Sequence, residues 1–353
     1  MRQVFAGSDG LRAGWSLLLY IVLLGSLMAG GIFLVNPKRL QPADTPTNSN
    51  AQPNAAAQSA SQSSKFSAHA ILTAKAVLLG DGTALLSVLI ATWLMGKIER
   101  RPNSAYGLGG KRRLRNFLVG LAWGVALLSL LVFTLRATGL LVFDARLLFG
   151  ASALRSAALW LSGFLLVGLF EEYFFRGYLQ FTLARGIRGI YDWFHKRYSC
   201  TQDARRIDTN ALGFWTAALL LSFGFGFTHR TNLGESPIGL VAAALIAVVF
   251  CLSLWRTGSL WWAIGFHAAW DWAQSFLYGV ADSGMMIQGH LFATHPAGRV
   301  LLSGGLTGPE GSLFILPIVA ATAAVIVLTL PSVHPDDSIS TTHTRTTAGL
   351  DLP

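Results

Sequence analysis

The sequence has few charged residues and almost no cysteine, and each shortage excludes a class of protein. Charged residues make up 12% of the 353 residues, about half the share found in a soluble domain. An ordinary soluble globule does not fit this composition, and neither does a disordered protein. The 2 cysteines, Cys200 and Cys251, stand far apart. They match neither a zinc-finger spacing nor the disulfide framework of a small secreted domain.

Acidic residues are scarcer than basic ones, with 17 Asp and Glu against 27 Lys and Arg and a formal net charge of +10. A protein that binds nucleic acid is basic too, but its positive charge is dense and patterned. Here whole stretches of about twenty residues carry no charge, so we expect no nucleic-acid partner. Apolar residues make up 52% of the chain and the mean hydropathy is +0.50, which together indicate a polytopic membrane protein.

The sequence contains many long apolar runs. A helix needs about 20 apolar residues to cross the hydrocarbon core of a bilayer. Eight runs predict an all-α fold, a polytopic membrane helix bundle of about eight transmembrane helices. The predicted spans are residues 12–35, 70–96, 116–138, 148–184, 211–229, 237–255, 259–280 and 312–330.

Three of these runs depart from a simple span. The first follows Arg2 and Arg12, as a signal peptide would, but it is long and no clear small-x-small cleavage site follows it. We therefore interpret it as a retained helix. The second contains Lys75 and Asp81, so its spanning part is expected to begin near Gly82. The fourth is too long for one crossing, so part of it must tilt or leave the bilayer.

Lys and Arg concentrate in two of the loops. Residues 97–115 contain seven of them and residues 185–209 contain six, whereas 37–66 contain three and 281–311 contain one. Basic loops favour the cytoplasmic side, which predicts that both termini of an eight-span chain are cytoplasmic. Such loops also touch anionic lipid, so the lipid bilayer itself is an expected partner.

Ionisable groups inside apolar spans are costly, and each is a functional hypothesis. In GLFEEYFFRGYLQ, Glu172 and Arg176 are spaced i,i+4 and share one helix face, whereas Glu171 points about 100° away. A structural ion pair would explain Glu172 and Arg176. It would not explain a second, adjacent carboxylate.

Two further clusters carry histidine. In SFGFGFTHRTN, Phe225 and His229 are spaced i,i+4 at the end of a span, and this cluster alone favours an interfacial histidine. In GFHAAWDWAQ, His267 and Asp271 have the same spacing, and a self-paired couple is the simpler alternative. The flanking Trp270 is interpreted as a packing or interfacial residue, like Trp272.

The three clusters together place two Glu, one Arg, two His and one Asp on three apolar helices. Carboxylates beside histidines can activate water as general bases, or can bind a divalent cation that does so. No HExxH motif is present, so the chain is not a zincin.

The ordered motifs EExxxR, FxxxH and HxxxN/D, each on a separate membrane helix, resemble the CPBP family of intramembrane proteases. That family includes the type II CAAX prenyl endopeptidases and the Abi-type bacterial proteins. The match runs from Glu171 to Asp271, and the segment LLSGGLTGPEGSLF (residues 301–314) resembles the family's Gly-rich approach to the last helix.

The resemblance implies a role for each of the motif residues. Glu171 would be the general base that activates water, and His229 would hold that water or bind a metal with it. Glu172 and Arg176 would orient the site by pairing.

His267 and Asp271 would stabilise the oxyanion or complete a metal sphere. The family often has Asn at the position of Asp271; Asn can donate a hydrogen bond to an oxyanion, but an ionised Asp cannot. Asp271 is therefore protonated, or it orients His267, or it ligates a metal. The candidate ligands for a divalent metal such as zinc are Glu171, His229, His267 and Asp271.

We therefore expect an intramembrane endopeptidase of the metalloprotease type that hydrolyses a peptide bond of a membrane-associated protein or peptide, with a prenylated CAAX-type end as one candidate substrate. The open alternatives are a proton-coupled transporter, which would favour inverted repeats that we do not find, and a catalytically silent Abi or immunity-type membrane protein. The expected location is the bacterial cytoplasmic membrane.

The domain organisation follows from these patterns. Residues 1–114 are expected to hold N-terminal transmembrane helices with a disordered polar loop at 37–68, and 115–330 to form the CPBP-like protease domain. The tail at 331–353 is polar and expected to be disordered.

Overall fold

The computed structural model describes residues 6–7, 10–35, 70–198 and 208–331. These residues form a bundle of helices, and no sheet in the described part has more than two strands. The all-α membrane bundle predicted from the sequence is thereby confirmed. The polar loop expected at 37–68, and all but the first residue of the tail expected at 331–353, lie outside the described residues.

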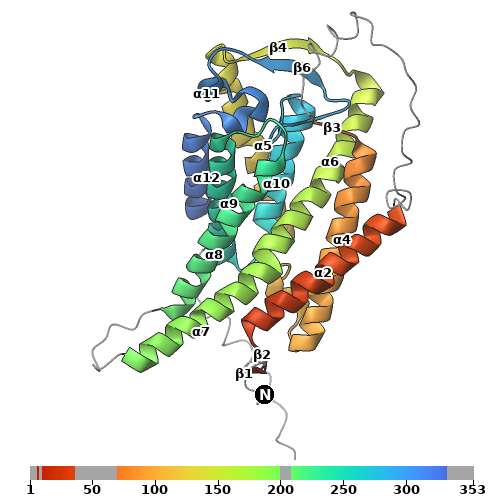
Figure 1. The fold of residues 1–353 in the computed structure, drawn as a ribbon. Helices are drawn as coiled ribbons and strands as arrows, with labels where there is room; N and C mark the ends of the chain where they lie inside the picture. The colour runs from red at the N-terminus through yellow and green to blue at the C-terminus, as the bar shows by residue number, and fades with distance from the viewer. Residues whose placement is uncertain (1–5, 8–9, 36–69, 199–207, 332–353) are drawn as a thin grey trace, which may run out of the picture.

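In chain order, the described passes along the bundle are α2, α4, α5, the continuous α6–η4–α7, α8, α9, α10 and α12 (Figure 1). Six helices in this part of the chain are long and apolar enough to cross a membrane. The passes correspond in order to the eight predicted spans, but α10 and α12 are shorter, at 12 and 15 residues. The bounds are α2 Ala13–Val35, α4 Ala74–Glu99, α5 Arg113–Ala137, α6 Gly150–Glu172, η4 Tyr173–Leu179, α7 Gln180–Tyr198, α8 Thr209–Thr228, α9 Pro237–Thr257, α10 Trp261–Trp272, η6 Ala273–Leu277 and α12 Ile315–Thr329, with the short helices η3 Asn103–Tyr106, η5 His229–Thr231, α11 Val300–Ser303, η7 Gly305–Thr307 and η8 Pro309–Gly311.

Helix starts follow local capping chemistry. The side chain of Thr73 accepts a hydrogen bond from the backbone at the start of α4, and Asp208 does the same for α8. Ser236 caps α9, where Pro237 occupies the first turn. These side chains satisfy amide groups that the helix itself leaves unpaired.

Short strands close one end of the bundle. β4 (Leu141–Arg146) pairs antiparallel with β6 (Phe292–Pro296), and β3 (Ala70–Leu72) pairs parallel with β5 (Met285–Ile287). A small pair, β1 (Ala6–Gly7) and β2 (Gly10–Leu11), lies near the opposite end (Figure 1). We call the end with β3 to β6 the strand end. The end with the turn between α4 and α5 and the C-terminal part of α7 is the basic end.

The fourth predicted span, 148–184, continues as helix into the segment 185–209, which the sequence predicts as a loop. α6, η4 and α7 together cover Gly150–Tyr198, which is 49 residues. At about 1.5 Å per residue this helix is more than twice as long as the roughly 30 Å hydrocarbon core is thick. It runs diagonally across the bundle and its end extends beyond the other helices (Figure 1), as the expectation of tilt required.

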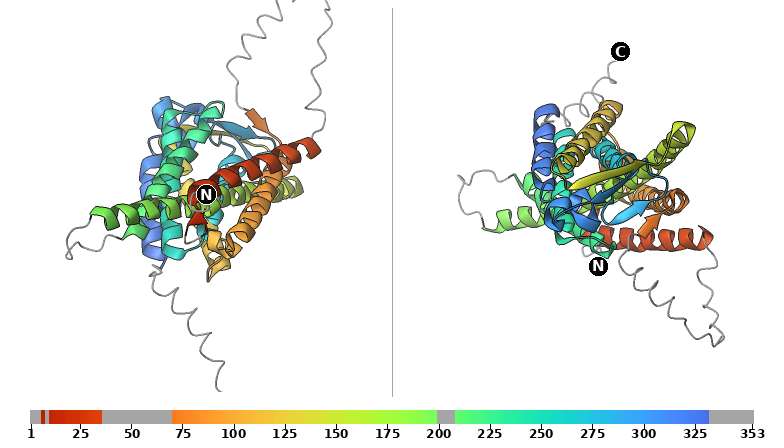
Figure 2. Two further views of the ribbon diagram at one scale, coloured as in Figure 1. Left: turned by 60° about the horizontal axis from the view of Figure 1, so that its bottom comes forward. Right: turned by 90° about the horizontal axis from the view of Figure 1, so that it is seen from above.

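α10 lies in the interior of the bundle, packed along α5 (Figure 2). Glycines permit this approach, because a Cβ atom on Gly120 or Gly124 of α5 would collide with the backbone of α10. A Cβ atom on Gly265 of α10 would in turn meet the backbone of α5. Small residues at such contacts let membrane helices pack closely, and here they fix the helix that carries His267 and Asp271.

Candidate active site

A cavity of about 310 Å³ lies inside the bundle toward the strand end. Apolar side chains such as Phe164 and Phe250 form much of its wall. Polar side chains come from several helices and from the strand-end loops. They are Asp81, Glu171, Thr228, His229, Asn232, His267, Asp271, Ser275, Asp282, Ser283, Glu310 and Thr322.

Glu172 is fully buried and holds two cationic or polar partners on one oxygen. Nη1 of Arg176 donates to its Oε1 at 2.8 Å, and Nδ1 of His267 lies 2.8 Å from the same oxygen. The i,i+4 pairing of Glu172 with Arg176 is therefore present. The guanidinium of Arg176 also lies over the ring of Phe225, 4.5 Å from its centroid.

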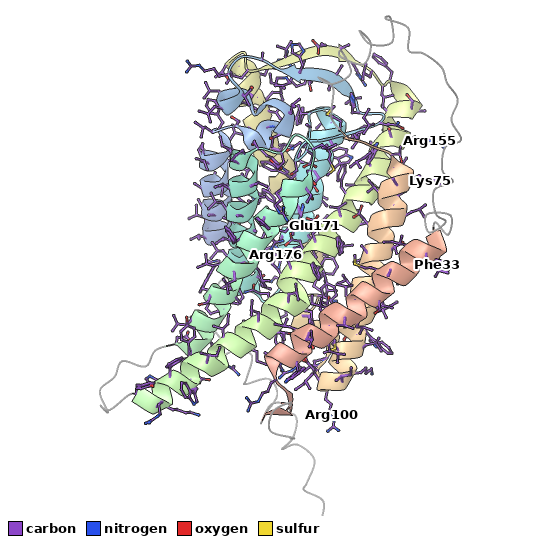
Figure 3. All side chains as sticks on the ribbon, viewed as in Figure 1. Phe33, Lys75, Arg100, Arg155, Glu171 and Arg176 are labelled. Atoms are coloured by element: carbon purple, nitrogen blue, oxygen red, sulfur yellow. The ribbon has the colours of Figure 1, made fainter. Side chains whose placement is uncertain are left out.

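The other nitrogen of His267 faces two more carboxylates. Its Nε2 lies 3.5 Å from Oδ2 of Asp271 and 3.7 Å from Oε2 of Glu171. The Glu171 side chain is 23% exposed, whereas that of Glu172 is 0% exposed. The two adjacent acids thus have different surroundings, as their 100° separation on the helix predicted. Glu171 borders the cavity, midway along the long helix (Figure 3).

Both helices that carry site carboxylates change geometry next to them. α6 becomes the π-helix η4 directly after Glu172, and α10 becomes the π-helix η6 directly after Trp272. π-helical turns are rare and occur mostly at functional sites. No sequence pattern had indicated either of them.

His229 reaches the cavity from the end of α8, on the turn η5. Its Nδ1 lies 2.8 Å from the carbonyl oxygen of Phe225. Because a carbonyl only accepts, Nδ1 carries the proton, and Nε2 is left as the nitrogen that can accept from water. The ion pairs found among the described residues include none between His229 and a carboxylate.

A family model described as type II CAAX prenyl endopeptidase Rce1-like matches residues 153–273. Residues 153–273 are Rce1-like. The resemblance stated from the motifs is thereby confirmed, and the Rce1-like segment contains all six candidate residues from Glu171 to Asp271. No curated protein and no solved structure matches the chain.

At the level of the family, the Rce1-like segment is that of a CAAX-type intramembrane protease. Together with the six long apolar helices, it identifies an integral membrane protein. The segment lies inside the predicted domain 115–330, whose boundaries stay a prediction.

Several cavity residues lie outside the Rce1-like segment and were missed. Glu310, in the Gly-rich segment 301–314, accepts a hydrogen bond from Nε1 of Trp270 at 2.8 Å. Its other oxygen accepts from the hydroxyl of Ser283 at 3.1 Å. Trp270 therefore does more than pack. Asp81, noted only as an imperfection of its span, also borders the cavity.

Acidic groups in the strand-end loops hold their protons more tightly than usual. Burial raises the pKa of Asp282 well above its ordinary value, and the nearby charges of Asp271 and Glu310 raise it further. Burial likewise raises the pKa of Glu235 to about 7. These acids therefore add less negative charge at neutral pH than their number suggests.

The residues as placed do not assemble a metal site. Among the described residues, no group of three or more His, Cys, Asp or Glu side chains is arranged to hold a metal ion. His267 already directs Nδ1 to Glu172, and His229 has no paired carboxylate. The divalent metal inferred for Glu171, His229, His267 and Asp271 stays a prediction.

Proposed function

We propose that the chain is an intramembrane endopeptidase in which Glu171 activates a water molecule to hydrolyse a peptide bond. The observation that carries the proposal is the unequal placing of two adjacent acids. Glu172 is buried and held by Arg176 and His267, whereas Glu171 borders the cavity. A carboxylate of that kind can take a proton from water.

In the proposed reaction, Glu171 acts first as the base and then as the acid. Glu171 takes a proton from water while the water oxygen bonds to the scissile carbonyl carbon, and the C=O electron pair moves onto oxygen. Collapse of this oxyanion re-forms the C=O bond and breaks the C–N bond. The acid form of Glu171 returns the proton to the departing nitrogen.

His267 is the group best placed to stabilise the oxyanion. In its doubly protonated form, the ring donates to Glu172 from Nδ1 and presents the Nε2 proton to the cavity side, near Glu171 and Asp271. Asp271, at 3.5 Å from Nε2, orients this ring. That role explains an Asp where the resembling family often has Asn.

His229 and Arg176 complete the site in different ways. The Nε2 atom of His229 accepts a hydrogen bond from water and so helps to hold it. Arg176 is a positioning residue that neutralises Glu172 and thereby fixes His267.

The substrate we propose is a membrane-associated protein or peptide, with a prenylated CAAX-type end as the specific class. The apolar walls of the cavity, which include Phe164, Val167 and Ile246, support a substrate with an apolar chain near the cleaved bond. The transporter alternative lacks such support, because the described residues show no second half of the bundle that repeats the first, as inverted-repeat transporters have.

The test compares membrane-associated peptides in cells that express the wild type or Glu171→Gln. We expect uncleaved substrates to accumulate with Glu171→Gln and their products to disappear. Asp144→Asn is the matched control, because Asp144 lies on β4, exposed and paired with His295 outside the cavity. Identical peptide sets in wild type and Glu171→Gln would refute the proposal.

Metal dependence needs its own test on the purified protein. Loss of cleavage on chelation, restored by zinc, supports the predicted metal. Full cleavage by a preparation shown to be metal-free excludes it.

A further inference from the structure

A second cavity, of about 720 Å³, lies on the basic-end side of the candidate active site. It is bounded by η4, α7, the start of α8 and the turn between α9 and α10. Four arginines line it, together with the aromatic side chains of Tyr106, Phe181, Phe214 and Trp255. The arginines are Arg101, Arg176, Arg185 and Arg188.

Within the described part of the chain, each of these guanidinium groups has a buried nitrogen without a hydrogen-bond partner. The atoms are Nε of Arg101, Nη2 of Arg176, Nη1 of Arg185 and Nε of Arg188. The side chain of Arg176 is only 2% exposed. A buried donor without a partner costs free energy, so four of them around one cavity indicate a missing acceptor.

The charge around the cavity is also unbalanced. Glu172 neutralises Arg176, and Glu99 pairs with Arg185 at 3.2 Å and lies 4.0 Å from Arg101. No carboxylate is among the residues that line this cavity in the described part of the chain. Four guanidinium groups thus share two carboxylates, and although the side chain of Arg101 is 27% exposed, cationic groups drawn away from water favour an anionic partner.

We propose that this cavity binds a phosphate group, carried by an anionic phospholipid headgroup or by a soluble phosphate. Guanidinium groups match the oxygens of phosphate in geometry and charge, and basic pockets between membrane helices are suited to lipid headgroups. The amide oxygen of Gln180, buried and without a partner, can accept from a headgroup hydroxyl. The site does not depend on the proposed peptidase activity.

Arg176 connects this cavity to the candidate active site. Its Nη1 donates to Glu172, while its Nη2 has no partner and the residue lines the basic cavity. A phosphate bound in this cavity would lie beside the residue that holds Glu172.

The experiment uses the full chain, purified and delipidated in neutral detergent. Binding and Tm are measured with dioleoyl phosphatidylglycerol, with dioleoyl phosphatidylcholine, and with inorganic phosphate. The test variant is Arg101→Gln with Arg188→Gln. The control is Arg113→Gln with Arg115→Gln, which removes the same charge from exposed positions of the basic end.

We expect phosphatidylglycerol to bind and to raise the Tm of the wild type and the control, and to bind the test variant at least about tenfold more weakly. An equal effect from inorganic phosphate alone identifies the ligand as a soluble phosphate. Equal losses in test and control variants would overturn the proposal, as would no preference for phosphatidylglycerol together with no effect of phosphate. If the double variant does not fold, Arg188→Gln alone is used, because it removes one guanidinium of the cavity and leaves the contact of Arg101 with Glu99 in place.

Discussion

Two buried glutamates, Glu99 and Glu172, are each paired with an arginine of the same long helix, yet their surroundings differ. Glu99, at the basic end, pairs with Arg185 at 3.2 Å, and Glu172 pairs with Arg176 at 2.8 Å. Both side chains are almost completely excluded from solvent. The contrast lies in how the remaining hydrogen-bonding capacity of each carboxylate is used.

Glu99 is satisfied on both oxygens. Oε1 accepts from Arg185 and from the hydroxyl of Tyr178, and Oε2 accepts from the hydroxyl of Tyr106, each at 3.2 Å. Burial, reinforced by the charge of Glu99, raises the pKa of Tyr106 above its ordinary value, so this phenol keeps its proton and donates.

Glu172 is satisfied on one oxygen only. Oε1 holds both Arg176 and His267, whereas Oε2 has no hydrogen-bond partner among the described residues. A second acid, Glu171, lies beside it on a cavity. A buried acid–arginine pair is therefore not by itself a sign of a catalytic site. The signs of a catalytic site are a carboxylate with partners on one oxygen only and a second carboxylate beside it that borders a cavity.

The largest expected effect is a difference in catalytic activity between variants at the Glu172 region, which includes Glu171, and variants at the Glu99 region. Glu171→Gln should lower the rate of peptide cleavage by about 10²–10⁴-fold, because it removes the general base. Glu99→Gln should leave the rate per folded molecule unchanged. Single-turnover cleavage in proteoliposomes, normalised to folded protein, measures both, and equal rates in Glu171→Gln and the wild type would end the distinction.

The reverse effect is expected on stability. Glu99→Ala should lower the free energy of unfolding by about 3–5 kcal/mol, because Arg185 is left as a buried charge without its partner. Denaturant unfolding in micelles measures the change. A matched replacement of both residues, Glu99→Leu with Arg185→Met, should recover much of the loss. A stable but inactive Glu99→Ala protein would show that Glu99 belongs to the chemistry.

A smaller effect should distinguish the two arginines. Arg176→Lys should lower kcat by about tenfold to a hundredfold with little change in KM, because an ammonium group cannot fix Glu172 and pack over Phe225 as a guanidinium does. Arg185→Lys should leave kcat unchanged. Steady-state kinetics of both variants test this, and equal losses would contradict separate roles.

The smallest effect concerns Glu235, an acid that is not fully buried and does not line the cavity of the candidate active site. Because the folded-state pKa of Glu235 is about 7, above its ordinary 4.5, its contribution to stability is complete below about pH 4.5 and is lost as pH rises through 7. Glu235→Gln should remove this loss and gain about 1 kcal/mol above pH 7, since solvent screens the half-exposed carboxyl. Unfolding at pH 4.5 and pH 8 measures it, and parallel pH profiles in both proteins would contradict it.

Local spacing was sufficient to predict part of the site. Glu172 with Arg176, and His267 with Asp271, are i,i+4 pairs whose proximity follows from helix geometry alone. The apolar runs likewise predicted the order of the helices. Ionisable residues inside apolar runs were therefore the signal by which the sequence located the candidate site.

The missed features all depend on contacts between distant segments. Glu99 meets Arg185 across 86 positions and Glu310 meets Trp270 across 40, and no periodicity links such residues. Glu99 lies inside the basic segment 97–115, and no pattern in the sequence singles it out. The π-helical turns after Glu172 and Trp272 likewise carry no local sequence signal.

The glycine contact between α5 and α10 has a consequence for how the sequence can vary. Gly120, Gly124 and Gly265 line neither the cavity of the candidate active site nor the basic cavity, yet a methyl group at any of them would push apart the two helices and move His267. In a scan of every substitution, these positions should tolerate as little change as the ionisable residues themselves. The chain thus carries two kinds of constrained position, one set by the chemistry of the site and one by the close approach of two helices.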